Sequence, residues 1–420
     1  MQTKGLRSNK IILFLGLVFL TTLIACVEEY WPKVNFESDY LLFVEGKITN
    51  EPGPYQIKLS KSVAIEKYLN AENNAVRRAI VIVNDDLGNS EQLTETEPGI
   101  YQTSPSGIRG VVGRQYKVSI SSEDGRNYES DFQELLEPIQ IESLTSQRVG
   151  RYTHDNELEE GFQFLVSSES FNSNTNYFYW ELEETYKYQT AYAIHLIYKG
   201  LINGRHVYQE PSDPDSLRYC YQTNRIESFT FNTKEISSQK INNLPLSFLP
   251  FGDERAKLRY SLLAKQYIIS ENAHTYLDGF LNQGAGQEGL YLTQPYQIKG
   301  NLINVENPDE VVLGYFLVAS TSQSKRVFVS PPDDVDLFVP PPCTYQGAPD
   351  CSETPVQYTF STLQDDYGTS PELLPRYIAK ERIFDCRINM TNLLVIFPKA
   401  DCIDCQARGG VLNKPDFWIE

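Results

Sequence analysis

Histidine and local catalytic motifs are both scarce in this sequence. The four histidines, His154, His195, His206 and His274, are scattered, and none has the HExxH spacing of a preassembled zinc site. We interpret each as a surface or packing residue. Serine-elbow (GxSxG), phosphate-loop and dinucleotide-binding motifs are also absent, which excludes the motif-bearing hydrolases and nucleotide enzymes. We therefore predict a non-enzymatic protein with no catalytic residue, no metal site and no cofactor.

Positive charge is in the minority. Lysine and arginine number 37 against 55 aspartates and glutamates, which gives a net charge of −18. The first 25 residues carry three of the positive charges and no negative one, so without them the net charge is −21. Such a body repels nucleic acid and anionic lipid headgroups. We therefore expect no nucleic-acid partner.

The N-terminus lacks an apolar run long enough for a transmembrane helix. Ile11 to Cys26 is almost wholly apolar, but its 16 residues fall short of the roughly 20 that span a bilayer. Basic residues precede this run, and the short exit sequence Leu23-Ile24-Ala25-Cys26 ends it. We interpret residues 1–25 as a signal peptide and exclude them from the fold.

The exit sequence resembles the lipobox of bacterial lipoproteins. This resemblance implies that Cys26 is diacylated and becomes the first residue of the mature protein. Two or three acyl chains, at about 0.8 kcal/mol per buried methylene, would hold a soluble body stably to a membrane. Glu28 and Glu29 follow and resemble the surface-export signal of lipoproteins in the Bacteroidota. The alternative is that they only belong to a solvated tether, which we place at residues 26–38.

Six further cysteines, an even number in an exported chain, favour disulfides. They are Cys220, Cys343, Cys351, Cys386, Cys402 and Cys405. Their pairing stays open, but we expect Cys343 with Cys351 first, because a loop containing glycine and proline separates them. Each bridge would add about 2–4 kcal/mol to the stability.

Cys402 and Cys405 form a CxxC pair, a spacing found in redox sites, zinc sites and structural disulfides. A redox motif of the thioredoxin type needs a helix starting at the first cysteine, but Gly409, Gly410 and Pro415 break any helix within two turns. A zinc ribbon needs a second pair, and only a single cysteine lies upstream nearby. The pattern therefore favours structural disulfide bonding.

Abundant aromatic residues and short apolar runs predict a mainly β protein. Between residues 39 and 138, runs such as Tyr40–Ile48, Ala79–Val83 and Gln115–Ile120 are bounded by turn residues, as in a small β-sandwich. This domain resembles an immunoglobulin-like sandwich of the transthyretin or carboxypeptidase-regulatory type. The resemblance rests on Ile80-Val81-Ile82-Val83-Asn84, Asp86-Leu87-Gly88, Pro98-Gly99-Ile100-Tyr101 and Gly113-Arg114-Gln115-Tyr116. Such modules usually position other domains and seldom catalyse.

Residues 139–420 predict a larger β-rich domain with one short helix. Phe162–Val166 and Phe178–Glu183 alternate as strands, and a polar stretch from Asn203 to Ser216 interrupts the sheet. We expect the helix near residues 270–283, because Ser270 is a suitable N-cap and apolar residues behind it recur at helical spacing. This helix should pack across a sheet face.

Two features suggest ligand binding, and each has a simpler interpretation. Asp333, Asp334 and Asp336 offer oxygen ligands to calcium, but the loop lacks the glycine and distal glutamate of an EF-hand, so a solvated loop is favoured. The 27 tyrosines could line a platform for sugar or peptide, or they could fill the margins of a sandwich. The sequence leaves this choice open.

Several motifs are spread along the mature chain. They are Val34-Asn35-Phe36 through Val44-Glu45-Gly46, Ile298-Lys299-Gly300-Asn301, Glu310-Val311-Val312-Leu313-Gly314-Tyr315-Phe316, Cys402 to Cys405, Arg408-Gly409-Gly410 and Lys414-Pro415-Asp416-Phe417-Trp418. With them the chain resembles, over nearly all of its mature length, a Bacteroidota lipoprotein family known as domain of unknown function 4249. The terminal motif is the most specific. The resemblance implies attachment to the outer membrane and, because such families are often encoded beside TonB-dependent receptors, an accessory role. It implies no catalytic residues.

Two main hypotheses follow. The first is a lipid-anchored outer-membrane protein that faces the cell exterior and serves as an accessory or binding subunit of a TonB-dependent transporter. The second is a structural or assembly subunit of another envelope complex. A hydrolase whose catalytic residues come from distant parts of the chain is a third and less favoured hypothesis.

Overall fold

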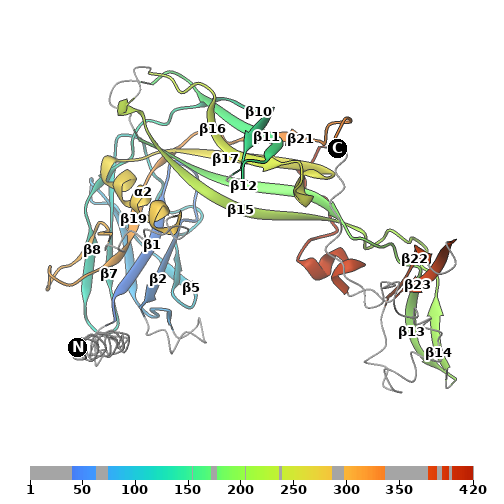
Figure 1. Ribbon diagram of the computed structural model, residues 1–420. Helices are drawn as coiled ribbons and strands as arrows, with labels where there is room; N and C mark the ends of the chain where they lie inside the picture. Colours follow the sequence, from blue (N-terminus) through green and yellow to red (C-terminus); the bar gives the residue numbers. More distant parts are fainter. Residues whose placement is uncertain are drawn as a thin grey trace, which may run out of the picture. The chain divides into compact units, whose positions relative to one another are not determined.

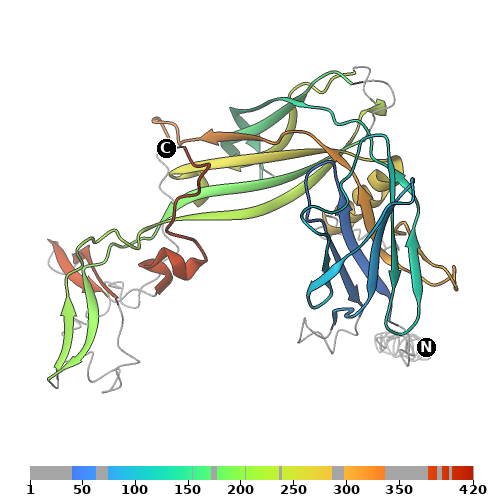
Figure 2. The same ribbon diagram turned by 180° about the vertical axis from the view of Figure 1, so that it is seen from behind.

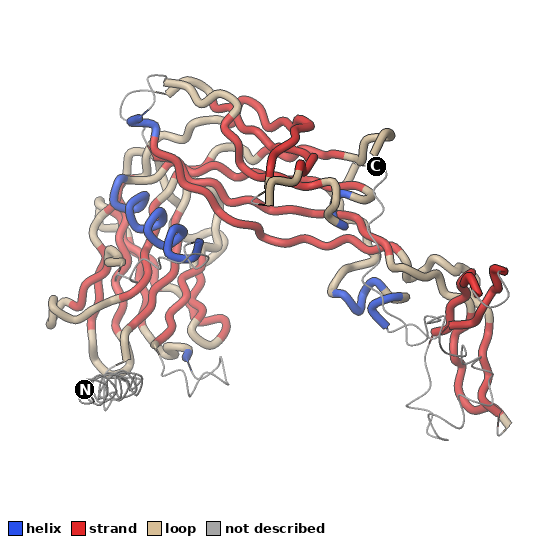
Figure 3. The backbone as a smooth tube through the Cα atoms, in the orientation of Figure 1, coloured by secondary structure: helices blue, strands red, loops and turns tan. Residues whose placement is uncertain are grey.

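The structure is mainly β, as the sequence predicts. The computed structural model describes residues 40–62, 74–153, 155–171, 177–203, 205–235, 239–285, 298–335, 377–385, 390–396 and 400–419. The chain divides into a leading unit up to Tyr40 and a second unit from Leu41 onward, which is the unit described below. Its described residues form several β-sheets and one α-helix, α2 (Figures 1 and 3). No helix in the described ranges is long and apolar enough to cross a membrane.

Two sheets form the sandwich expected at the start of the fold (Figure 2). The first has the order β19-β1-β2-β6-β5, with β19 Leu313–Val318, β1 Leu42–Ile48, β2 Gln56–Lys61, β6 Ile100–Gln102 and β5 Thr94–Glu97. The second has the order β18-β8-β7-β3-β4, with β18 Leu302–Asn304, β8 Asn127–Ser130, β7 Gln115–Ser121, β3 Ile80–Asp85 and β4 Ser90–Gln92, and β9 Gln133–Glu134 pairs with β7. The strands expected between residues 39 and 138 are thus confirmed.

Period-two alternation places the core of this sandwich. In β7 the side chains of Tyr116, Val118 and Ile120 are buried, whereas the residues between them are only half-buried. Because successive side chains of a strand point to opposite faces, the apolar set faces the opposite sheet. The turn expected after β3 contains Gly88, whose φ of +86° is a conformation that glycine adopts without steric cost.

Two strands of the sandwich come from far along the chain, which the sequence did not indicate. β19 pairs in parallel with β1, from Phe43 opposite Leu313 to Ile48 opposite Val318. β18 pairs antiparallel with β8. Parallel neighbours need a long crossover, and here the chain between them includes the rest of the first block and much of the second sequence region. The block expected at residues 39–138 therefore shares its sheets with residues 302–318.

Small residues allow β19 to approach β1 closely. Gly314 has a φ of +89°, and a Cβ atom there would overlap the carbonyl oxygen of Val44. A Cβ atom on Gly300 would overlap the carbonyl oxygen of Gly314 in the same way. The Asn301 side chain donates to the carbonyl oxygen of Phe316 and accepts from its amide, both at 2.9 Å. The motif residues Gly300, Asn301 and Gly314 thus fix β19 in the sandwich.

The second region contains two sheets of longer strands around an aromatic core. One has the order β10-β11-β16, with β10 Ile141–Tyr152, β11 Leu158–Ser168 and β16 Leu244–Pro250. The other has the order β15-β12-β17-β20, with β15 Tyr219–Asn232, β12 Tyr177–Gln189, β17 Arg259–Ile268 and β20 Ser320–Thr321, and β21 Lys325–Val329 pairs with β17. Phe164, Phe178 and Trp180 are fully buried in their shared core. The strands expected at 162–166 and 178–183 lie within β11 and β12.

A further sheet includes part of the polar stretch at residues 203–216. β14 (Arg205–Gln209) pairs with β13 (Leu196–Ile202), β13 with β22 (Tyr377–Asp385), and β22 with β23 (Met390–Ile396). The stretch does interrupt the long-stranded sheet, as expected, but it also contributes a strand of its own. The hydrogen bonds between paired strands join backbone groups, not side chains. A polar segment can therefore form a strand when it lies beside the unpaired edge of another strand.

The helix predicted near residues 270–283 is α2 (Glu271–Ala285). The Ser270 hydroxyl accepts from the amide of Ala273 at 3.2 Å, which confirms it as the N-cap. Ala273 is fully buried, and the Tyr276 ring lies 4.8 Å from that of Tyr315 on β19. The helix contacts β12, β15 and β19 (Figure 3) and so packs across strands, as expected.

A partly buried ionic contact joins the first sandwich to the long-stranded sheet. The Lys47 ammonium on β1 lies 2.7 Å from the Glu181 carboxylate on β12, and the Tyr267 hydroxyl on β17 donates to the same carboxylate at 2.7 Å. Burial acts to raise the pKa of Glu181, but the Lys47 charge and these hydrogen bonds outweigh it and hold the pKa below its usual 4.5. The charged form of Glu181 therefore stabilises the fold.

Replacing Glu181 by glutamine is expected to lower the free energy of unfolding by about 1 kcal/mol near neutral pH. The expected loss is modest because about a third of each side chain still faces water. Since the pKa of Glu181 is depressed in the folded state, its contribution to stability is complete above pH 4.5 and disappears as the pH falls through the folded pKa.

Urea unfolding at pH 7 and pH 3 tests this prediction. The stability advantage of the wild-type protein over Glu181→Gln should be smaller at pH 3 than at pH 7, and an equal difference at both values would contradict the prediction. Glu97→Gln, on the exposed strand β5, is the control.

Candidate functional site

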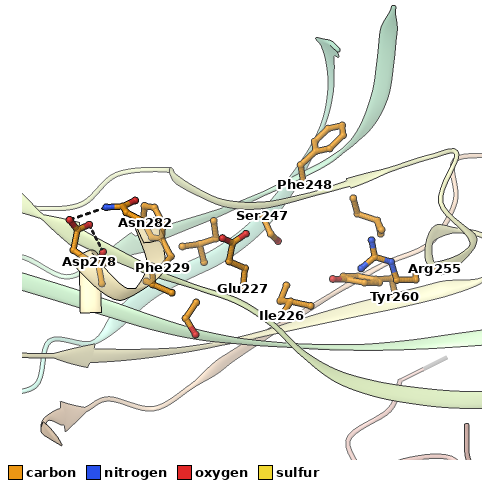
Figure 4. A pocket seen from close by; sticks show the side chains of 14 residues that line it. Ile226, Glu227, Phe229, Ser247, Phe248, Arg255, Tyr260, Asp278 and Asn282 are labelled. Carbon is orange, nitrogen blue, oxygen red and sulfur yellow. Dashed lines mark hydrogen bonds between the residues drawn. The ribbon is translucent and has the colours of Figure 1, made fainter. Parts of the chain in front are cut away.

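A pocket of about 450 Å³ opens between the two long-stranded sheets and the end of α2 (Figure 4). Its lining residues come from β15, β16 and α2, together with Arg255 and Tyr260: Ile226, Glu227, Ser228, Phe229, Thr230, Leu246, Ser247, Phe248, Leu249, Arg255, Tyr260, Asp278, Leu281 and Asn282. This volume is typical of small ligand sites. In Figure 4, Asp278 and Asn282 lie at one end and Arg255 and Tyr260 at the other, with Glu227 and Ser247 between them.

The two strands that supply most of the pocket lining, β15 and β16, are sheet edges. In the described part of the chain, β15 pairs along its length only with β12, and β16 pairs only with β11. The single exception on β15 is an isolated bridge between Tyr221 and Val411, outside the pocket. Edge strands present backbone N–H and C=O groups that have no ladder partner, and they are the places where another strand can add.

Each edge also carries a β-bulge at the pocket. Trp180 and Leu182 of β12 pair with Phe229 and Ile226 of β15, so β15 has one extra residue between them. On β16 the extra residue is Leu246, because the register shifts between the pairs at Ser247 and Pro245. A bulge bends its strand and redirects side chains, and bulges are common next to binding sites. The extra residues on both strands belong to the pocket wall.

The one cation among the described lining residues is neutralised by its neighbours. The Arg255 guanidinium donates to the Asp253 carboxylate at 2.6 Å and to the Glu184 carboxylate at 2.7 Å. Glu184 is almost fully buried and also accepts from the Tyr260 hydroxyl at 3.0 Å. Burial and the Glu184 charge raise the pKa of Tyr260, so this hydroxyl stays protonated at neutral pH. Arg255 is thus already bound within the wall of the pocket.

The opposite end of the pocket is acidic. The Asp278 carboxylate accepts from the Thr230 hydroxyl at 3.2 Å and from the Asn282 amide at 3.1 Å, so it is positioned but has no cationic partner among these contacts. Glu227 is exposed and forms no ion pair with a described residue. With Arg255 neutralised by two carboxylates, Glu227 and Asp278 leave the pocket with negative charge.

Hydroxyl groups and carboxylates line the pocket, but no histidine or lysine is among its described lining residues. The Ser247 Oγ atom is buried without a hydrogen-bond partner, and the Thr230 hydroxyl donates to the Asp278 carboxylate. A serine needs an adjacent base to become a nucleophile. What the described lining of this site offers is apolar surface, strand edges and negative charge.

The structure brings together only some of the site residues predicted from sequence. Cys220 and Cys405, which are 185 residues apart, form a disulfide, and Cys402 is also disulfide-bonded. Both cysteines of the CxxC pair are therefore disulfide-bonded, but they are not bonded to each other. Cys26, Glu28, Glu29, Cys343, Cys351 and Cys386 lie outside the described residues, and so does the pairing that we expected first.

The terminal motif holds the C-terminal segment against β12 and β15. The Tyr188 hydroxyl donates to the carbonyl oxygen of Cys405 at 2.6 Å, beside the disulfide. A Cβ atom on Gly410 would overlap the Tyr188 hydroxyl, so glycine allows this close approach. Trp418 is buried, with its ring 5.1 Å from that of Tyr221. This C-terminal clamp, residues 405–418, has a structural role.

The weaker candidates from the sequence have structural partners. Asp334 forms an ion pair with Arg148 at 2.8 Å, and Asp336 lies outside the described residues. Many tyrosines are core residues, among them Tyr101 and Tyr128, both about 1% exposed. The His274 ring packs 5.0 Å from that of Tyr177. Across the residues that the structure describes, no three histidine, cysteine or acidic side chains are grouped closely enough to hold a metal ion.

Sequence reasoning missed the pocket entirely. Phe229, Leu246 and Phe248 belong to ordinary strand patterns, and nothing local marks a strand as a sheet edge. The one local indication of the pocket is the spacing of Asp278 and Asn282. They are four residues apart, so their polar side chains lie on the same face of α2.

Comparison with known proteins identifies a family but no function. No curated protein matches the chain. A family described as "Domain of unknown function (DUF4249)" matches residues 27–325. This range contains the Gly300-Asn301 and Gly314 motifs but not the terminal one, so it is shorter than the near-complete coverage expected. Because the match spans well over half of the chain, the protein belongs to the family of domain of unknown function 4249.

Proposed function

We propose that this protein is a lipid-anchored outer-membrane lipoprotein that acts as a non-enzymatic binding subunit of a TonB-dependent transporter. The observation that carries the binding role is the pocket between the edges of β15 and β16, with apolar walls and uncompensated negative charge. Two free edges at one pocket suit the recruitment of another chain or ligand. The membrane role rests on the sequence around Cys26, which resembles a lipobox.

The high negative charge of the body supports this proposal. An acidic protein is repelled by anionic lipid headgroups, so acyl chains on Cys26 would hold it at a membrane while its body stays in solution. Glu28 and Glu29, directly behind the cysteine, support export to the cell surface. At that location the pocket would meet incoming ligands before a receptor does.

Affinity purification from detergent-solubilised outer membrane tests the proposal. The tagged wild-type protein should retain a TonB-dependent receptor in stoichiometric amount, as read by mass spectrometry. Cys26→Ala should be absent from the outer-membrane fraction, because it has no thiol to acylate. Recovery of β-barrel assembly or secretion components instead would favour an assembly subunit. A wild-type protein recovered alone would contradict the transporter role.

A further inference from the structure

The free edge of β16 is suited to an added strand. The pocket-lining residues Ser247 to Leu249 of β16 follow the bulge at Leu246 and pair in regular register with β11. The pocket-lining segment of β15, in contrast, contains its bulge. A regular edge offers alternating backbone donors and acceptors, so it pairs better than a bulged one. The side chains of Phe248 and Leu249 add apolar surface beside it.

The polar groups of the pocket favour a cationic occupant. Glu227 and Asp278 carry negative charge without a cationic partner in the described contacts, and Arg255 is neutralised by Asp253 and Glu184. The Ser247 hydroxyl is buried in the wall without a hydrogen-bond partner. This atom is closed to water, so recognition of an occupant rests on the charged groups of the pocket and on the strand edge.

We propose that the pocket binds an extended peptide segment that adds to the free edge of β16 and places a lysine or arginine between Glu227 and Asp278. Main-chain hydrogen bonds to the edge would give affinity without regard to sequence, and the acidic pair would select the cationic side chain. The proposal rests on the binding role proposed above, but not on membrane attachment or on a receptor.

The test uses the purified full-length lipoprotein in detergent and two synthetic peptides. Each has about ten residues of alternating threonine and valine, which are strand formers, with one central lysine or one central glutamate. Calorimetry or fluorescence anisotropy should show that the lysine peptide binds at least about tenfold more tightly. N-methylation of alternate amides along one edge of the lysine peptide should abolish binding, because it removes the donors that pair with β16.

The matched variants are Glu227→Gln with Asp278→Asn, which keep size and hydrogen-bonding capacity but remove both charges. This double variant should bind both peptides equally, with a loss of about tenfold for the lysine peptide. If the double variant folds poorly, Glu227→Gln can be tested alone, because Glu227 is exposed and its replacement should not disturb the fold. This single substitution should reduce the preference for the lysine peptide about threefold. Glu97→Gln, an exposed acid on β5, should bind like the wild type.

Three results would overturn the inference: no binding of either peptide, equal binding of the methylated peptide, or an unchanged lysine preference in the double variant. The outcome is separable from that of the proposed function. A receptor retained without peptide binding would refute only the peptide site. Peptide binding without a receptor would refute only the transporter role.

Discussion

Replacing Gly314 by alanine is expected to destabilise the protein by about 3 kcal/mol or more. A left-handed backbone costs an L-residue about 1–2 kcal/mol. At this position the new Cβ atom would also overlap the carbonyl oxygen of Val44, a backbone atom that cannot move without shifting β1. The parallel pairing of β19 with β1 would therefore be lost or displaced. The midpoint and free energy of urea unfolding measure the effect.

Gly88→Ala is the matched control for this prediction. Gly88 has nearly the same backbone φ, +86°, but apart from the residues next to it in the chain no atom lies within 4 Å of the position that its Cβ would occupy. Only the conformational cost of about 1–2 kcal/mol should appear there. If both variants lose the same stability, the close approach of β19 to β1 is not what requires glycine at position 314.

Replacing both Cys220 and Cys405 by alanine is expected to cost about 2–5 kcal/mol. The bridge closes a separation of 185 residues and holds the C-terminal clamp against β15. Without it, the unfolded chain gains conformational freedom, and the contact between Tyr188 and the Cys405 carbonyl loses its support. Urea unfolding in non-reducing buffer should show the loss, and limited proteolysis should release the C-terminal segment first.

The control for the disulfide prediction is Glu254→Gln, which weakens the clamp without touching its covalent link. Glu254 pairs with Arg408 at 2.7 Å, and ion pairs of this partly exposed kind contribute about 1 kcal/mol or less. The double cysteine variant should therefore be clearly less stable than Glu254→Gln. Peptide mapping of the wild type that linked Cys402 to Cys405 would contradict the pairing itself.

Several described residues of the family motifs join distant parts of the chain. Glu310 accepts hydrogen bonds from Tyr128 at 2.8 Å and from Asn304 at 2.6 Å, across the junction of β8 and β18. Gly300, Asn301 and Gly314 secure β19, and Gly410 allows the C-terminal clamp to approach Tyr188. These motif residues therefore report how the fold is assembled, and none of the described ones lines the pocket.

The strands and the helix were predictable because their signals are local. Alternation in Tyr116, Val118 and Ile120 has the period of a strand, and Ser270 caps a segment with the spacing of a helix. The strand β14 was missed because its polar residues show no such period. The pairing of Cys220 with Cys405 was equally hidden, since spacing along the chain does not reveal proximity in space.

The sequence by itself determined the mainly β class, the single described helix and the excess of negative charge, because composition and short-range periodicity settle each of them. Only the tertiary structure decided that β19 completes the first sandwich, that Cys405 bonds to Cys220, and that β15 and β16 are edges around one pocket. These features depend on pairings between segments far apart in the chain. Whether a strand is central or at an edge is a property of its neighbours, and a strand's own residues do not encode it.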